Sequence, residues 1–127
     1  MGEREGRKTP QIPMKVYLCG PMRNIEKFNF PAFEAAEQYL LSQGIDVISP
    51  HSMDINNGFD PLNGDTEPPA VEDCARRDID AIFEVDALVL LPGWRNSRGA
   101  TAEKALADWI EKPCFEYPSL TPLESPE

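Results

Sequence analysis

Two acidic side chains lie on the apolar faces of segments that are predicted to be helical. At about 100° per residue, Val71, Ala75 and Ile82 form a narrow apolar stripe, and Asp78 lies inside it. In the next helical segment Glu103 lies beside the inward-facing line in the same way. A carboxylate in apolar surroundings is costly unless it is paired or hydrogen-bonded, and such groups gather at functional sites. A shielded, ionised carboxylate can act as a nucleophile, and a second carboxyl can carry a proton.

A structural role for the same two residues is also open. Asp78 could bond Arg76, Arg77 or a loop backbone, and Glu103 could merely flank the stripe as a carboxylate near a helix start. We expect the other charged residues of these segments, Arg77 and Lys104 among them, to face water. The position of Glu103 favours a functional role, because a helix N-terminus stabilises an anion.

Positive charge is concentrated in the loops that follow the predicted strands. Three of the five arginines in residues 14–116, namely Arg23, Arg95 and Arg98, fall in these loops. Together with Ser97 and the backbone amides around Gly99 at a helix start, they predict a cradle for a phosphate or another monoanion. Arginines scattered over the surface are the alternative.

Other chemistry finds less support in the sequence. Trp94 and Tyr17 could offer flat faces to a base, although aromatic residues more often belong to the core. His51 is the single histidine, and no GxSxG motif surrounds any serine, which disfavours a serine or cysteine hydrolase. The Gly20-Pro21-Met22-Arg23 run is neither GxGxxG nor a P-loop, which disfavours dinucleotide and triphosphate sites.

The elements that must position these residues alternate regularly along the chain. Strands are predicted at residues 14–19, 45–49, 87–91 and 114–116, and helices at residues 31–43, 70–84 and 99–112. Right-handed crossovers then give an α/β fold, a small doubly wound (flavodoxin-like) parallel sheet with helices on both faces. Loops 20–24, 50–54 and 92–99 follow the strands and should line one crevice. We expect one domain over residues 14–116, a flexible lid at 53–70, and loose tails at 1–13 and 117–127.

Composition limits the partners. The 127 residues carry a formal net charge of −10, which opposes binding to polymeric nucleic acid. No apolar run approaches the roughly 20 residues of a membrane span. The three cysteines are far apart and without CxxC spacing, so we expect no disulfide framework, no metal site and no cofactor. These features and the polar first residues favour a cytoplasmic protein.

Three motifs in order resemble the nucleoside 2-deoxyribosyltransferase superfamily, including its 2'-deoxynucleoside 5'-monophosphate N-glycosidases. They are VYLCGPMR at residues 16–23, RDID at 77–80 before VDALVL at 85–90, and SRGATAE at 97–103. The resemblance implies a flavodoxin-like fold and cleavage of an N-glycosidic bond. It also implies a homo-oligomer.

The resemblance further implies a role for individual residues. Glu103 matches the nucleophile that attacks the anomeric carbon, Asp78 the aspartate that assists the leaving base, and Tyr17 the tyrosine of the first strand. Arg23 and Ser97 match the residues that hold a 5'-phosphate. In the same crevice, Gly20, Gly99 and Trp94 are further candidates for binding substrate.

We therefore expect a small-molecule nucleotide or nucleoside as the ligand and N-glycosidic cleavage of a (deoxy)nucleoside 5'-monophosphate as the reaction. Base exchange by a nucleoside 2-deoxyribosyltransferase, a non-catalytic nucleotide-binding module and a purely structural domain are the alternatives. Pro21 stands where the monophosphate glycosidases carry a serine, and segment 53–70 is unlike theirs, so the substrate is open.

Overall fold

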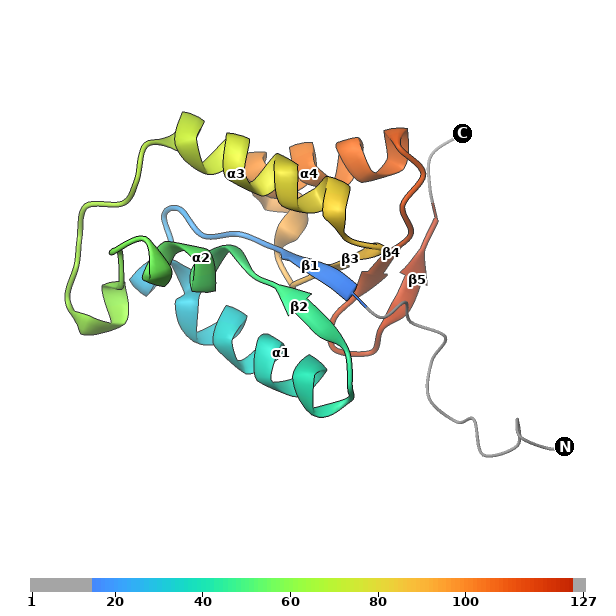
Figure 1. The fold of residues 1–127 in the computed structure, drawn as a ribbon, viewed down its shortest axis with the longest axis horizontal. Helices are drawn as coiled ribbons and strands as arrows, with labels where there is room; N and C mark the ends of the chain where they lie inside the picture. Colours follow the sequence, from blue (N-terminus) through green and yellow to red (C-terminus); the bar gives the residue numbers. More distant parts are fainter. Residues whose placement is uncertain (1–14, 125–127) are drawn as a thin grey trace, which may run out of the picture.

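A five-stranded sheet forms the centre of the protein, whose computed structural model describes residues 15–124 (Figure 1). The strand order is β2-β1-β3-β4-β5, and every neighbouring pair is parallel except β4 with β5. The strands are β1 (Lys15–Cys19), β2 (Asp46–Ile48), β3 (Ala87–Leu90), β4 (Cys114–Glu116) and β5 (Thr121–Leu123).

Helices cover both faces of the sheet, with α3 and α4 on one side and α1 on the other (Figure 1). The helices are α1 (Phe30–Ser42), α2 (Pro50–Asn56), α3 (Val71–Glu84) and α4 (Arg98–Trp109), with short 3-10 turns η1 (Glu26–Asn29), η2 (Pro61–Asn63) and η3 (Trp94–Asn96). The predicted doubly wound α/β architecture is confirmed.

Alternation along β1 divides the core in two. Val16 and Leu18 pack toward α1, whereas Tyr17 and Cys19 pack toward α3 and α4, and all four are fully buried. Successive side chains of a strand point to opposite faces, so a central strand needs apolar or shielded residues at every position. β1 therefore delivers Tyr17 into the layer that also contains Asp78 and Glu103.

Two predicted irregular segments contain regular structure. Residues 50–56 form α2, whose first turn starts with Pro50 and whose His51 and Asp54 are buried. The predicted loose tail from residue 117 is wrong for residues 121–123, because these pair with β4 and Leu120 beside them is buried. The predicted tail at residues 1–13 lies outside the described residues.

Candidate functional site

A hydrogen bond between β1 and α4 defines the centre of the candidate site. The Tyr17 hydroxyl donates to Glu103 Oε2 over 3.0 Å. Tyr17 is fully buried, so its phenol holds one carboxylate oxygen in a direction fixed by the sheet.

The start of α4 sets the position of Glu103. Ser97 caps the helix, since its Oγ accepts from the Ala100 amide over 3.1 Å. Ala100 is buried and its carbonyl accepts from Cys19 Sγ over 3.4 Å, which ties the first turn to the end of β1. Glu103 follows in the second turn, facing the sheet.

Asp78 of α3 reaches the same place and is 8% exposed. Burial, followed by the negative charge of Asp78, raises the pKa of Glu103 to about 8, although the Tyr17 hydroxyl and the Cys19 thiol act in the opposite direction. Burial raises the pKa of Asp78 as well, against the attraction of Arg77. Two carboxyls coupled in this way titrate as a unit, and near neutral pH the pair retains a proton.

Arg77 joins Asp78 to α2. Its Nη1 donates to Asp54 Oδ1 over 2.7 Å, and its Nε donates to Asp78 Oδ1 over 2.9 Å. The prediction that Arg77 faces water is wrong, because the side chain turns toward these two carboxylates and is only 20% exposed. The sequence did not indicate Asp54 or Cys19 as neighbours of the two carboxyls. Asp54 lies in the predicted crevice loop 50–54, and Cys19 ends the predicted strand before loop 20–24.

The predicted phosphate-binding residues lie at loops around this centre. Arg23 is exposed and its Nη2 donates to the carbonyl of Pro69 over 2.9 Å, which joins the first loop to the segment before α3. Gly99 is exposed and has open space around it, whereas Ser97 is engaged as the cap of α4. None of the described contacts joins Arg23 to Glu103 or Asp78.

Gly20 has a packing role at this edge of the sheet. A Cβ at this position would lie 2.9 Å from Leu91 Cβ, because the ends of β1 and β3 approach closely there. The close approach explains the glycine without a ligand.

Trp94 is covered on one face. The guanidinium carbon of Arg95 lies 4.5 Å from the ring centroid. The buried indole Nε1 has no hydrogen-bond partner among the described residues. The ring face of Trp94 that Arg95 covers is therefore not free to stack on a base.

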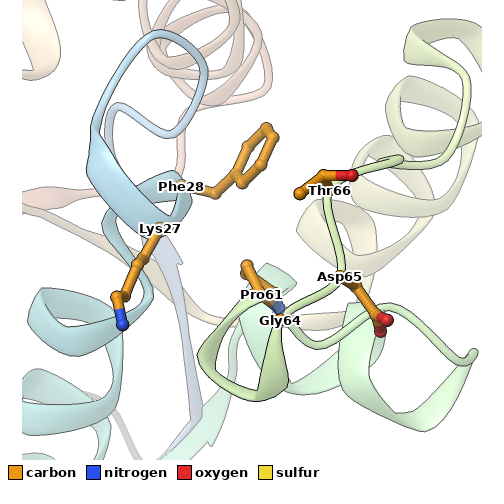
Figure 2. Close-up of a pocket in the computed structure, with 6 residues that line it drawn as sticks. All are labelled: Lys27, Phe28, Pro61, Gly64, Asp65 and Thr66. Carbon is orange, nitrogen blue, oxygen red and sulfur yellow. The ribbon is translucent and has the colours of Figure 1, made fainter.

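A hollow of about 210 Å³ lies between η1 and η2 (Figure 2). Its lining comes from η1 and from the predicted lid at 53–70, and consists of Lys27, Phe28, Pro61, Gly64, Asp65 and Thr66. Lys27 and Phe28 adopt positive φ values of 52° and 53°, an uncommon conformation for residues with side chains. Neither Glu103 nor Asp78 contributes to this lining.

Two further findings concern the described residues only. Nowhere in residues 15–124 do three or more His, Cys, Asp or Glu side chains gather so as to hold a metal ion. None of the helices in this range has the length and apolar content needed to cross a membrane.

Comparison with known proteins places this fold. A family model described as a domain of unknown function (DUF4406) matches residues 14–115. No curated protein matches the chain at a significant level.

Several solved structures resemble the protein. The 2-deoxyribosyltransferase from the psychrotolerant bacterium Bacillus psychrosaccharolyticus has a TM-score of 0.58 at 21% identity, over 80% of this chain and 70% of that one. BlsM, known from a solution structure, has a TM-score of 0.62 at 20% identity, over 82% of this chain and 64% of that one. A conserved protein from Enterococcus faecalis V583 has a TM-score of 0.54 at 22% identity, over 83% and 63%.

At these identities the likeness shows the fold, and this chain spans less than two thirds of BlsM and of the Enterococcus protein. The resemblance to the deoxyribosyltransferase superfamily that the sequence motifs predicted is thus confirmed at the level of the fold.

Proposed function

The chain belongs to the DUF4406 family, and from that premise and its carboxyl pair we propose that it cleaves the N-glycosidic bond of a (deoxy)nucleoside 5'-monophosphate and releases the free base. The observation that carries the proposal is the convergence of Tyr17, Asp78 and Glu103 from β1, α3 and α4. The likeness to a 2-deoxyribosyltransferase supports nucleoside chemistry at this place in the fold.

Glu103 is the nucleophile of this reaction. One of its oxygens bonds to C1' of the sugar as the bond from C1' to the base nitrogen breaks, and the electron pair of that bond leaves with the base. A carboxylate fixed beside an oxocarbenium-like centre stabilises the developing positive charge. The Tyr17 hydroxyl orients Glu103 through its hydrogen bond to Oε2.

Asp78 supplies the proton that the departing base nitrogen needs. Burial raises its pKa, which brings this carboxyl nearer to the pH range in which it can take up and pass on a proton. Water then attacks the glycosyl-enzyme ester and regenerates Glu103, with a proton passing back to the pair.

The loops around α4 bind the 5'-phosphate. The N-terminus of α4 offers free backbone amides at Gly99, and Ser97 stands beside them. Arg23 is exposed, and a phosphate can replace its contact with the Pro69 carbonyl at little cost. Substrate binding would thereby release the segment before α3 from the first loop.

Base exchange is the second candidate reaction. It uses the same glycosyl-enzyme, which a second base attacks in place of water. The likeness to the Bacillus 2-deoxyribosyltransferase favours it. Adding an acceptor base to the assay separates the two reactions, because only exchange forms a new nucleotide or nucleoside.

The test is a panel of nucleoside 5'-monophosphates and nucleosides, each with ribose or deoxyribose, analysed by chromatography for free base. We expect base release from a monophosphate, and loss of at least 10³-fold in Glu103→Gln. Glu84→Gln is the matched control, because Glu84 is an exposed carboxyl at the end of α3. Activity unchanged in Glu103→Gln, or no base released from any member of the panel, contradicts the proposal.

A homo-oligomer in the cytoplasm is part of the proposal. Val71 and Phe83 of α3 and Trp109 of α4 are 64%, 55% and 81% exposed, and large exposed apolar side chains support contact with another copy. Light scattering after size exclusion measures the mass directly, and a monomer at micromolar concentration contradicts this part.

A further inference from the structure

Arg77 lies at the junction between the carboxyl pair and α2, and the reaction proposed above assigns it no role. Its guanidinium bridges two carboxylates on different helices, Asp54 of α2 and Asp78 of its own helix α3. Both carboxylates are buried, with Asp54 5% and Asp78 8% exposed. A guanidinium so enclosed is held in one orientation, since its planar fork fixes the direction of each donor.

The geometry of the bridge is asymmetric. Arg77 Nε and Nη2 both lie 2.9 Å from Asp78 Oδ1, so two donors converge on one oxygen. Arg77 Nη1 lies 2.7 Å from Asp54 Oδ1. The described contacts of Arg77 do not include Oδ2 of Asp78.

We infer that Arg77 is a positioning residue: anchored by Asp54, it fixes the Asp78 carboxylate against Glu103 and holds it ionised, so that the proton retained by the pair resides on Glu103 until substrate binds. This inference rests on the proposed function for its chemical meaning. The position of the proton that the carboxyl pair retains can be measured without any substrate.

The surroundings of Glu103 agree with this location. β1 contributes the Tyr17 hydroxyl and the Cys19 thiol, α3 contributes Asp78, and no cation among these groups touches Glu103. Arg77, the nearest positive charge described in the cluster, contacts Asp78 and Asp54 instead. The guanidinium therefore favours the ionised form of Asp78 over that of Glu103.

The proton then has a defined route in the reaction. Glu103 gives its proton to Asp78 and becomes the carboxylate that bonds to C1'. Asp78 gives the same proton to the base nitrogen as the bond to C1' breaks. Asp78 is then again the carboxylate that Arg77 stabilises. The atoms and charges balance without a further proton donor, and Arg77 makes protonated Asp78 a stronger acid.

Carboxyl titration by NMR tests the inference. Protein labelled with ¹³C at the glutamate carboxyls is titrated from pH 4 to 10, and the Glu103 signal is identified by its absence in Glu103→Gln. With a pKa of about 8, about a tenth of Glu103 is ionised at pH 7 in the wild type. In Arg77→Gln the proton moves toward Asp78, and we expect the ionised fraction of Glu103 at pH 7 to rise at least threefold.

Matched variants test whether the Arg77 bridge between Asp54 and Asp78 sets the titration of Glu103. Arg76→Gln is the control, because Arg76 is the preceding residue and pairs with Glu72 on the exposed surface of α3. It should leave the Glu103 titration at the wild-type position. Arg77→Lys keeps a positive charge and should restore part of the wild-type curve. If Arg77→Gln does not fold, Arg77→Met removes the same positive charge and keeps the apolar stem, and it should move the Glu103 titration in the same direction.

The outcomes separate the two proposals. A Glu103 titration that is the same in Arg77→Gln, or in Arg77→Met where the former does not fold, overturns the positioning role even if the protein cleaves nucleotides. A shifted titration in a protein that cleaves no nucleotide supports the positioning role and overturns the proposed function. Where cleavage occurs, Arg77→Gln should lower kcat about 10-fold to 100-fold with KM little changed, since Arg77 acts through Asp78.

Discussion

Replacement of Glu103 by Gln should stabilise the fold, by an amount that depends on pH. The pKa of Glu103 is raised from 4.5 to about 8 in the folded protein, chiefly by burial. A group with a raised folded-state pKa contributes its stability fully below the unfolded-state pKa, and this contribution is lost as pH rises through the folded-state value. Stability should therefore fall between about pH 4.5 and pH 8 and level off above that.

The magnitude follows from the shift. A difference of one pKa unit corresponds to about 1.4 kcal/mol, so the shift of Glu103 corresponds to about 3 kcal/mol at pH 7 and about 5 kcal/mol at pH 9, a quantity that belongs to the coupled pair with Asp78. Gln has the shape of protonated Glu and does not titrate. We expect Glu103→Gln to match the wild type at pH 4 and to exceed its free energy of unfolding by these amounts at pH 7 and 9.

Urea unfolding at pH 4, 7 and 9, followed by circular dichroism, measures the difference directly. Glu84→Gln is again the control and should stay within about 0.5 kcal/mol of the wild type at each pH, as exposed substitutions do. A difference between Glu103→Gln and the wild type that is the same at all three pH values would refute the burial of an unfavourable charge at this position.

Three further predictions follow from the contacts around the site. Tyr17→Phe keeps the buried ring and removes the donor to Glu103, so it should lower kcat for base release about 10-fold to 100-fold, as measured by steady-state kinetics, and lower the free energy of unfolding by about 1–3 kcal/mol. Gly20→Ala should cost about 1–3 kcal/mol in urea unfolding because its Cβ meets Leu91, whereas Gly99→Ala meets open space and should be neutral or stabilising. Burial raises the pKa of all three thiols, so exposure decides which one reacts, and in the native protein a thiol reagent should modify the partly exposed Cys74 before the buried Cys19 and Cys114. Equal rates for all three thiols would contradict the buried positions of the other two.

The central elements were predictable because their sequences carry strong local signals. Buried parallel strands appear as continuous apolar runs, and α1 lies between Pro31 in its first turn and Gly44 after its end. α2 also has a proline, Pro50, in its first turn, but its seven residues are too few for an apolar period, and His51 and Asp54 are buried by tertiary contacts. β5 contains Pro122 and is an edge strand whose pairing with β4 no local pattern indicates.

The convergence of Asp78 and Glu103 was predictable because a helical wheel gives the direction of a side chain from its helix axis. A wheel does not give the position along the axis, and so Val71, on the same stripe as Asp78, is exposed at the first turn of α3. A helical wheel also ignores the length of a side chain, so it does not show that a long side chain can bend toward groups away from its own direction. Lys104, predicted to face water, is 8% exposed and pairs with Asp108 at 2.7 Å, and Arg77 reaches around α3 to Asp54.

The electrostatics of the carboxyl pair connect stability with the proposed reaction. A domain of this size has a free energy of unfolding of about 5–15 kcal/mol, so an unfavourable Glu103 charge of about 5 kcal/mol at alkaline pH is a large fraction of it. Tyr17 and Cys19 offset part of this cost, without removing it. The free-energy cost of the buried Glu103 charge is removed when this carboxylate bonds to an electron-poor carbon. The burial that weakens the fold above pH 8 is therefore the same property that would make Glu103 reactive toward C1' of a bound nucleotide.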